Sequence, residues 1–143
     1  NFKFDDYATI FRLVRTHVLL ETNKQLTQEN LIEALKNGHT FIGFDCLSDT
    51  GGFSFTAENG AQQKMQGDEI ALQNGVNFRA AAPQIARFVI FKNGEKVFES
   101  GENTEVVFEA KEPGAYRTEV YLDALGSPFD EMPWIVSNPV YVK

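Results

Sequence analysis

Hydrophobic and polar residues alternate along most of the chain after residue 38, and this alternation predicts a series of short β-strands. The clearest series lies within residues 86–123. Its strand-like segments are 87–91, 96–99, 104–109 and 116–122. In the last two segments apolar side chains occupy every second position, which is the period of a strand with one buried face. We expect each segment to be a strand of an antiparallel sheet.

Turn signals separate these segments. Asn93-Gly94 favours a type I′ hairpin turn, because that turn needs positive φ at both central residues. Pro113-Gly114 marks a second turn. Tyr116 follows it in a Gly-x-Tyr pattern, which many immunoglobulin-like sandwiches show where a tyrosine hydroxyl ties down a corner. These signals indicate a fold and carry no function.

The same reasoning predicts further strands on both sides of this series. The expected strands are 40–46, 53–58, 69–72, 76–82 and 134–142. Residues 40–46 carry apolar side chains on both faces, so this strand is expected to be central. Pro83 is expected to close its strand. Because proline has no amide to donate, the strand around Pro139 is expected to lie at an edge or to be irregular there. Residues 61–67 fit either a mobile loop or a weak edge strand.

The first 38 residues have helical periodicity instead. Residues 4–20 predict an amphipathic helix that runs into an extended piece, and the run 16–20 fits a strand equally well. A second helix follows Thr27, which is a good N-cap, and Gly38 stands where a C′ glycine belongs. Leu31, Ile32 and Leu35 share one face of this helix.

These patterns together predict a mainly β protein. We expect an immunoglobulin-like antiparallel β-sandwich of about 7–9 strands, preceded by two α-helices. Residues 1–38 form a helical lead-in that packs on the sandwich, and residues 39–143 form the β-sandwich domain. The two parts make one compact unit.

Composition and charge narrow the range of partners. The chain has 143 residues, thirteen of them Phe, and a formal net charge of −7. An acidic surface disfavours nucleic acid and anionic membranes as partners. No apolar run approaches the roughly 18 residues of a membrane span. The chain begins at Asn1 rather than Met, so we expect a fragment or a processed product. The sequence is compatible with a cytoplasmic location and with export.

Few residues of the chain are candidates for catalysis or metal binding. Cys46 is the single cysteine, and its apolar neighbours predict a buried small hydrophobe. His17 and His39 lie in different segments without metal-site spacing, so packing or hydrogen bonding is the expected role of each. Acids at 45 and 49, and at 123, 130 and 131, suggest a calcium site more weakly, because EF-hand spacing is absent. We therefore expect no catalytic residue, metal or other cofactor in this chain.

Aromatic residues offer a binding surface. Trp134, Tyr121, Tyr141 and Phe129 suit a platform on which a sugar ring stacks. The competing interpretation is that Trp134 fills the sandwich core, because large apolar residues are mostly buried.

Three segments resemble a known family when they are taken together. The motifs are YxxxFxxVxTHVLL at 7–20, ALxxGxxFIGFD at 34–45 followed by GFxFxA at 52–57, and PWIVSNPVYV at 133–142. In this order they resemble the region downstream of the catalytic domain in bacterial polymerase-and-histidinol-phosphatase (PHP) type metal-dependent phosphoesterases. The resemblance covers most of the chain.

The resemblance implies a non-catalytic accessory β-sandwich domain, whose partner is the catalytic PHP domain of the same polypeptide. In the family the catalytic metals are held by motifs such as H-x-H in the N-terminal barrel, and this chain has no such motif. The leading helices are expected to pack on that barrel. One alternative is a free-standing module that binds carbohydrate or protein, and another is a small hydrolase built on scattered acids.

Overall fold

A computed structural model describes the chain from residue 7 to residue 143. The helices are α1 (Tyr7–Leu13) and α2 (Gln28–Lys36), with 3-10 turns η1 (Asp123–Leu125) and η2 (Phe129–Glu131). The strands are β1 (Arg15–Val18), β2 (Thr40–Gly43), β3 (Ser54–Glu58), β4 (Gln63–Met65), β5 (Glu69–Ile70), β6 (Val76–Lys92), β7 (Glu95–Ala110), β8 (Gly114–Tyr121), β9 (Ile135–Ser137) and β10 (Val140–Val142). The predicted mainly β, sandwich-like fold with two leading helices is confirmed.

A long ribbon of β6 and β7 organises the sheet. The two strands pair from Val76 to Lys92 and turn at Asn93-Gly94. Asn93 and Gly94 have φ of 51° and 91°, so the predicted positive-φ hairpin is confirmed. β7 pairs with one edge of β6 on both sides of residues 82–85. The other edge of β6 pairs first with β3 and then with β8.

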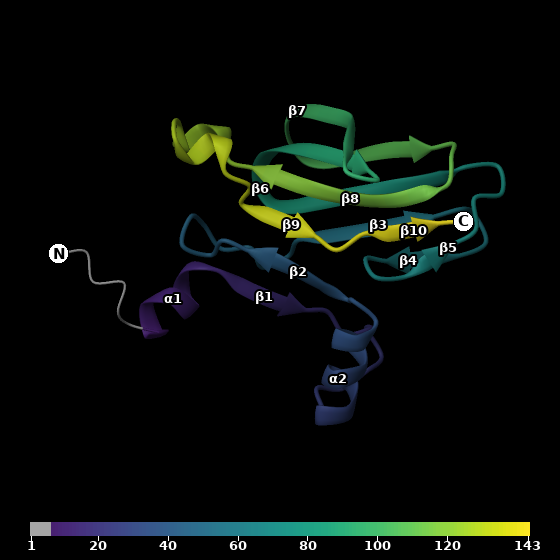
Figure 1. The fold of residues 1–143 in the computed structure, drawn as a ribbon, viewed down its shortest axis with the longest axis horizontal. Coiled ribbons are helices and arrows are strands. Elements are labelled where there is room, and N and C mark those ends of the chain that lie inside the picture. Colours follow the sequence, from purple (N-terminus) through teal and green to yellow (C-terminus); the bar gives the residue numbers. More distant parts are fainter. Residues whose placement is uncertain (1–6) are drawn as a thin grey trace.

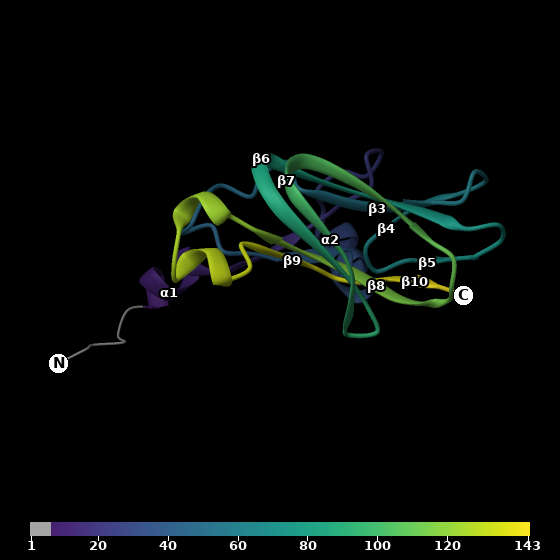
Figure 2. The ribbon, with the colours of Figure 1, turned by 90° about the horizontal axis from the view of Figure 1, so that it is seen from above.

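This change of partner produces two layers that share the ribbon. One layer follows the order β4-β3-β6, and the other follows β6-β8-β9-β2-β1. β10 also pairs with β8, and it makes a short parallel pair with β5. Figure 2 shows β6 and β7 curving together across the molecule. A strand that bends from one sheet into the other forms a corner of the sandwich.

The sequence prediction was wrong about where β6 ends. Pro83 does not close the strand, which continues to Lys92. The register shifts between Ala81 and Ala86, just where the partner changes from β3 to β8. A proline is tolerated there because no ladder hydrogen bond is required of it.

Two other strand boundaries also differ from expectation. Segments 96–99 and 104–109 belong to the single strand β7 rather than to two strands. The expected strand 134–142 is divided into β9 and β10, with Asn138-Pro139 between them. The irregularity predicted at Pro139 is confirmed, and residues 61–67 contain the short edge strand β4.

Side chains with period two fill the space between the layers. Phe55, Phe78 and Trp134 are fully buried there, and Tyr116 lies close to Phe78, with ring centroids 4.9 Å apart. The Tyr116 hydroxyl donates a hydrogen bond to the carbonyl oxygen of Glu112 over 2.9 Å. The predicted tyrosine-tied corner is therefore confirmed.

The lead-in is not purely helical. Residues 15–18 form β1, which pairs with β2 and extends the sheet, so the strand interpretation of this run is correct. The expected helix start at residue 4 lies outside the described residues. Figure 1 shows α2 projecting from the sheet below β1 and β2. Among the described residues, no helix has the length and apolarity needed to cross a bilayer.

The second helix, α2, begins at the predicted N-cap, but two of its apolar side chains are exposed. The Thr27 side chain accepts a hydrogen bond from the amide of Asn30, which confirms the N-cap. Ala34 is the buried residue of α2, whereas Ile32 and Leu35 are 42% and 49% exposed. Leu31 is half-buried, so the predicted apolar face of α2 is only partly covered.

Cys46 also differs from its prediction. β2 ends at Gly43, and the Leu47 amide donates to the carbonyl of Phe44, which closes a turn. Cys46 lies in this turn and is exposed, so it is not a buried small hydrophobe. The apolar sequence around it continues the strand pattern, but the chain has already left the sheet.

Candidate functional site

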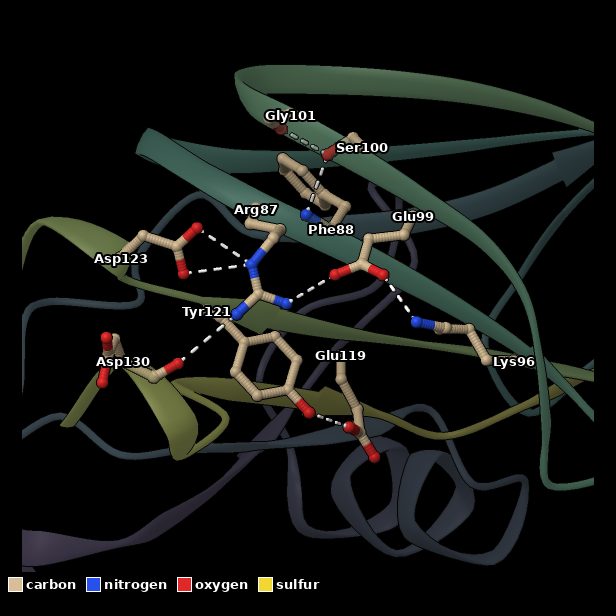
Figure 3. A network of polar contacts seen from close by, with 10 residues as sticks. All are labelled: Arg87, Phe88, Lys96, Glu99, Ser100, Gly101, Glu119, Tyr121, Asp123 and Asp130. Carbon is tan, nitrogen blue, oxygen red and sulfur yellow. Dashed lines mark hydrogen bonds and ion pairs between the residues drawn. The ribbon is translucent and has the colours of Figure 1, made fainter. Parts of the chain in front are cut away.

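A network of charged side chains surrounds Arg87, where β6, β8 and the η1–η2 loop meet (Figure 3). The Arg87 Nε donates to both carboxylate oxygens of Asp123, over 3.0 and 2.9 Å. Its Nη1 donates to Glu99 over 3.0 Å, and its Nη2 donates to the carbonyl oxygen of Asp130 over 3.4 Å. The guanidinium carbon also lies 4.6 Å from the ring centroid of Tyr121. Each of the three guanidinium nitrogens therefore donates at least one hydrogen bond.

The pKa values of Arg87 and Tyr121, already well above pH 7, are both shifted further upward in this network. The hydrogen bond with Asp123 raises the pKa of Arg87 above its ordinary value. Burial and the hydrogen bond to Glu119 raise the pKa of Tyr121 to about 12. Arg87 therefore stays cationic and Tyr121 stays neutral near pH 7. Because two carboxylates neutralise Arg87, the network serves to fix the loop 123–131 against the sheet.

The four aromatic residues predicted as a platform differ in their burial and in the elements that carry them. Trp134 is fully buried, and its Nε1 donates to the carbonyl oxygen of Ser48 over 2.9 Å, so the core interpretation is correct. Tyr121 is half-buried under Arg87. Phe129 is exposed on η2, in the loop that Arg87 holds. Tyr141 is exposed at the far end of β8, opposite Ala115.

His17 lies in a hydrogen-bonded cluster at the β1–β2 pair. Its Nε2 lies 3.0 Å from Asp45 Oδ2 and 3.0 Å from Thr50 Oγ1, and its ring stacks on Phe41. Thr50 donates to Asp45 Oδ1 over 2.6 Å. Burial alone raises the pKa of Asp45, but the hydrogen bonds from Thr50 and His17 outweigh it, and the pKa falls below its ordinary value. A Cβ on Gly43 would lie 2.8 Å from Thr50 Oγ1, so the cluster needs glycine there.

His39 forms a second pair with an acid. It is buried, and its Nε2 lies 2.8 Å from Asp68 Oδ1. The other oxygen of Asp68 accepts from the Met65 amide over 3.1 Å. The expected role of both histidines in packing and hydrogen bonding is therefore confirmed.

The acids proposed for calcium are engaged separately. Asp45 contacts His17, whereas Asp49 accepts from the amide of Gly51 over 3.1 Å. Asp123 is paired with Arg87. In the part of the chain that the structure describes, no three His, Cys, Asp or Glu side chains are placed to hold a metal ion together.

A hollow with a volume of about 500 Å³ lies beside the His39–Asp68 pair. We call it the His39 groove. Its lining residues are Glu21, Thr22, Asn37, His39, Thr56, Gln63, Lys64, Met65 and Asp68. Sequence reasoning missed this groove, because its walls come from segments far apart in the chain. No local motif connects the lead-in with β3 and β4.

Comparison of the chain with protein families, with curated proteins and with solved structures finds no match. None of these comparisons links the chain to PHP-type phosphoesterases, so the resemblance stays an expectation from the sequence motifs.

Proposed function

We propose that this chain is a non-catalytic accessory domain, which docks on the catalytic barrel of a PHP-type phosphoesterase in the same polypeptide. The observation that carries the proposal is the concentration of exposed apolar side chains on the lead-in. Among the described residues, seven exposed large hydrophobic side chains lie between positions 7 and 35: Tyr7, Phe11, Leu13, Val14, Leu26, Ile32 and Leu35. Tyr7 and Leu26 are each 78% exposed.

The sandwich does not need these side chains for its own core. The buried core cluster of the described residues begins at Phe41, and it contains none of the described side chains of α1, β1 or α2. Complete burial of a side chain such as Leu or Phe contributes about 1.5–3 kcal/mol. A partner that covers even part of this surface would therefore gain substantial binding free energy.

Charge distribution supports a protein partner. Residues 1–38 contain five basic and five acidic side chains, so the net charge of −7 comes from the sandwich. Centres of protein–protein interfaces are depleted of charge and enriched in aromatic residues. The lead-in as a whole carries no net charge, and its exposed apolar side chains include the aromatic residues Tyr7 and Phe11. The resemblance of the three motifs suggests the partner.

The test begins with the reading frame that encodes the chain. We expect an H-x-H-containing barrel upstream of Asn1. The barrel and the 143-residue chain are then produced separately, and their association is measured by calorimetry. A frame that encodes no such barrel, or a barrel that does not bind the chain, overturns the proposal.

Variants locate the docking surface. Leu35→Asp places a charge on the exposed face of α2 and is expected to weaken association at least tenfold. Ile85→Asp is the matched control, because Ile85 is an exposed apolar residue of β6, outside the lead-in. Equal effects of the two variants would contradict docking through the lead-in.

The non-catalytic part of the proposal has its own assay. The isolated chain is expected to hydrolyse no phosphate ester in the presence of Mn²⁺ or Zn²⁺. Turnover that survives purification and disappears in His17→Ala or His39→Ala would overturn it.

A further inference from the structure

We propose that the His39 groove is a binding site for a neutral oligosaccharide. The groove lies between the lead-in and the strand pair β3–β4. Glu21, Thr22 and Asn37 come from one side, and Thr56 and Gln63 come from the other. Its volume of about 500 Å³ falls within the usual range of small-molecule sites, which is about 300–1,000 Å³.

The lining of the groove is almost entirely polar. Eight of its nine residues have side chains that form hydrogen bonds, and Met65 is the exception. They include hydroxyls, amides, carboxylates, an imidazole and an ammonium group, which is a mixture of donors and acceptors. A sugar hydroxyl both donates and accepts, so a ring with several hydroxyls satisfies such a mixture. An apolar ligand would leave these groups unpaired at a cost of about 1–3 kcal/mol each.

Much of this hydrogen-bonding capacity is unused. Five of the lining side chains have no hydrogen bond or ion pair with another described residue: Thr22, Asn37, Thr56, Gln63 and Lys64. The neighbouring His39 and Asp68 are held by their mutual contact and by the Met65 amide. The groove therefore combines a fixed pair with side chains that are free to form hydrogen bonds with a ligand.

Charge and shape narrow the ligand class. Glu21 and Asp68 face the groove with Lys64 as the one lysine or arginine of the lining, in a chain with a net charge of −7, so a phosphate-rich ligand is disfavoured. A second hollow of about 200 Å³ shares Thr56 and Gln63 with the groove. Two hollows with a common wall suit a chain of linked rings better than a single compact molecule.

The direct test is a ¹H–¹⁵N NMR titration of the full chain with maltohexaose, cellohexaose, xylohexaose and chitohexaose at millimolar concentration. At least one of these neutral oligosaccharides is expected to shift the resonances of groove residues. Gln63→Ala and Thr56→Val are each expected to raise its Kd about fivefold, which corresponds to about 1 kcal/mol for one hydrogen bond. The spectrum of each variant also shows whether the fold is retained.

Matched controls separate the groove from the rest of the surface. Gln25→Ala and Thr104→Val change the same residue types at exposed positions outside the groove, and they are expected to leave the Kd unchanged. The docking variant Leu35→Asp is also expected to bind the sugar normally, because Leu35 does not line the groove. The proposal is overturned if none of the four sugars shifts any resonance. It is also overturned if the shifts gather at Phe129 or Tyr141, or if both groove variants bind with the original Kd.

Discussion

Gly67 follows β4 and packs against the end of α2, where the backbone leaves no room for a side chain. Its φ is +97°, and a Cβ at this position would lie 2.2 Å from the carbonyl oxygen of Asn37 and 2.7 Å from the carbonyl carbon of Gly38. The Gly67 amide also donates to the carbonyl oxygen of Pro139 over 2.7 Å. Gly67→Ala therefore forces a methyl group into backbone that cannot rotate away.

Two costs add in this variant. A non-glycine residue with left-handed φ costs about 1–2 kcal/mol. Overpacking of a close contact costs about 1–3 kcal/mol more, because the backbone at 37–38 must move. We expect Gly67→Ala to lower the free energy of unfolding by about 2–5 kcal/mol in total.

Gly60→Ala is the matched control. Gly60 has a similar φ of +83°, but apart from Gly60 and its two chain neighbours no heavy atom of the described residues lies within 4 Å of the position that a Cβ would take. It is expected to lose only the conformational cost of about 1–2 kcal/mol. Urea unfolding of both variants, followed by the fluorescence of the buried Trp134, measures the difference. Equal losses in the two variants would refute the close approach between Gly67 and the end of α2.

Two further predictions concern single contacts. Tyr116→Phe removes the hydrogen bond to the Glu112 carbonyl and is expected to lower the free energy of unfolding by about 1 kcal/mol in urea denaturation. For Asp45, the folded pKa lies below its ordinary value because of hydrogen bonds from Thr50 and His17, so its contribution to stability is present above about pH 4 and is lost on further acidification. Asp45→Asn is expected to reduce the loss of stability below about pH 4 in a series of urea titrations.

Each of these predictions has a contrary outcome. Tyr141→Phe is the control for Tyr116→Phe, since Tyr141 is exposed and its hydroxyl has no hydrogen bond among the described residues. If both phenylalanine variants lose the same stability, the hydrogen bond between Tyr116 and Glu112 contributes nothing to the free energy of unfolding. For Asp45→Asn, an acid dependence identical to that of the unchanged chain would show that its carboxylate is not stabilised in the folded state.

Local signals in the sequence predicted local structure well. Asn93-Gly94 forms the expected hairpin, Thr27 caps α2, and Tyr116 ties its corner. Each of these features depends on groups within a few residues of one another. Alternation also predicted which side chains of β3 and β8 face the core, because the period of a strand fixes this once one face is buried.

Features that depend on distant segments were not predictable in this way. The strand through Pro83 continues because β7 pairs along its edge on both sides of the proline, which no local pattern reveals. Cys46 is exposed because the chain turns away at Phe44, where its amide donates to the carbonyl of Trp134. The His39 groove needs the lead-in and β4 side by side, and that proximity exists only in the folded chain.

The shared ribbon sets an order for folding. β6 and β7 are joined by a two-residue turn, so their pairing closes a short loop and can form early. β2 joins the sheet only through β9, where Phe41 pairs with Ser137. On the ribosome, the β1–β2 pair therefore waits for almost the entire chain to emerge before it gains its place. Until then Phe41, which is buried in the folded chain, lacks most of its core neighbours, and nascent chains that stall before β9 are expected to be chaperone clients.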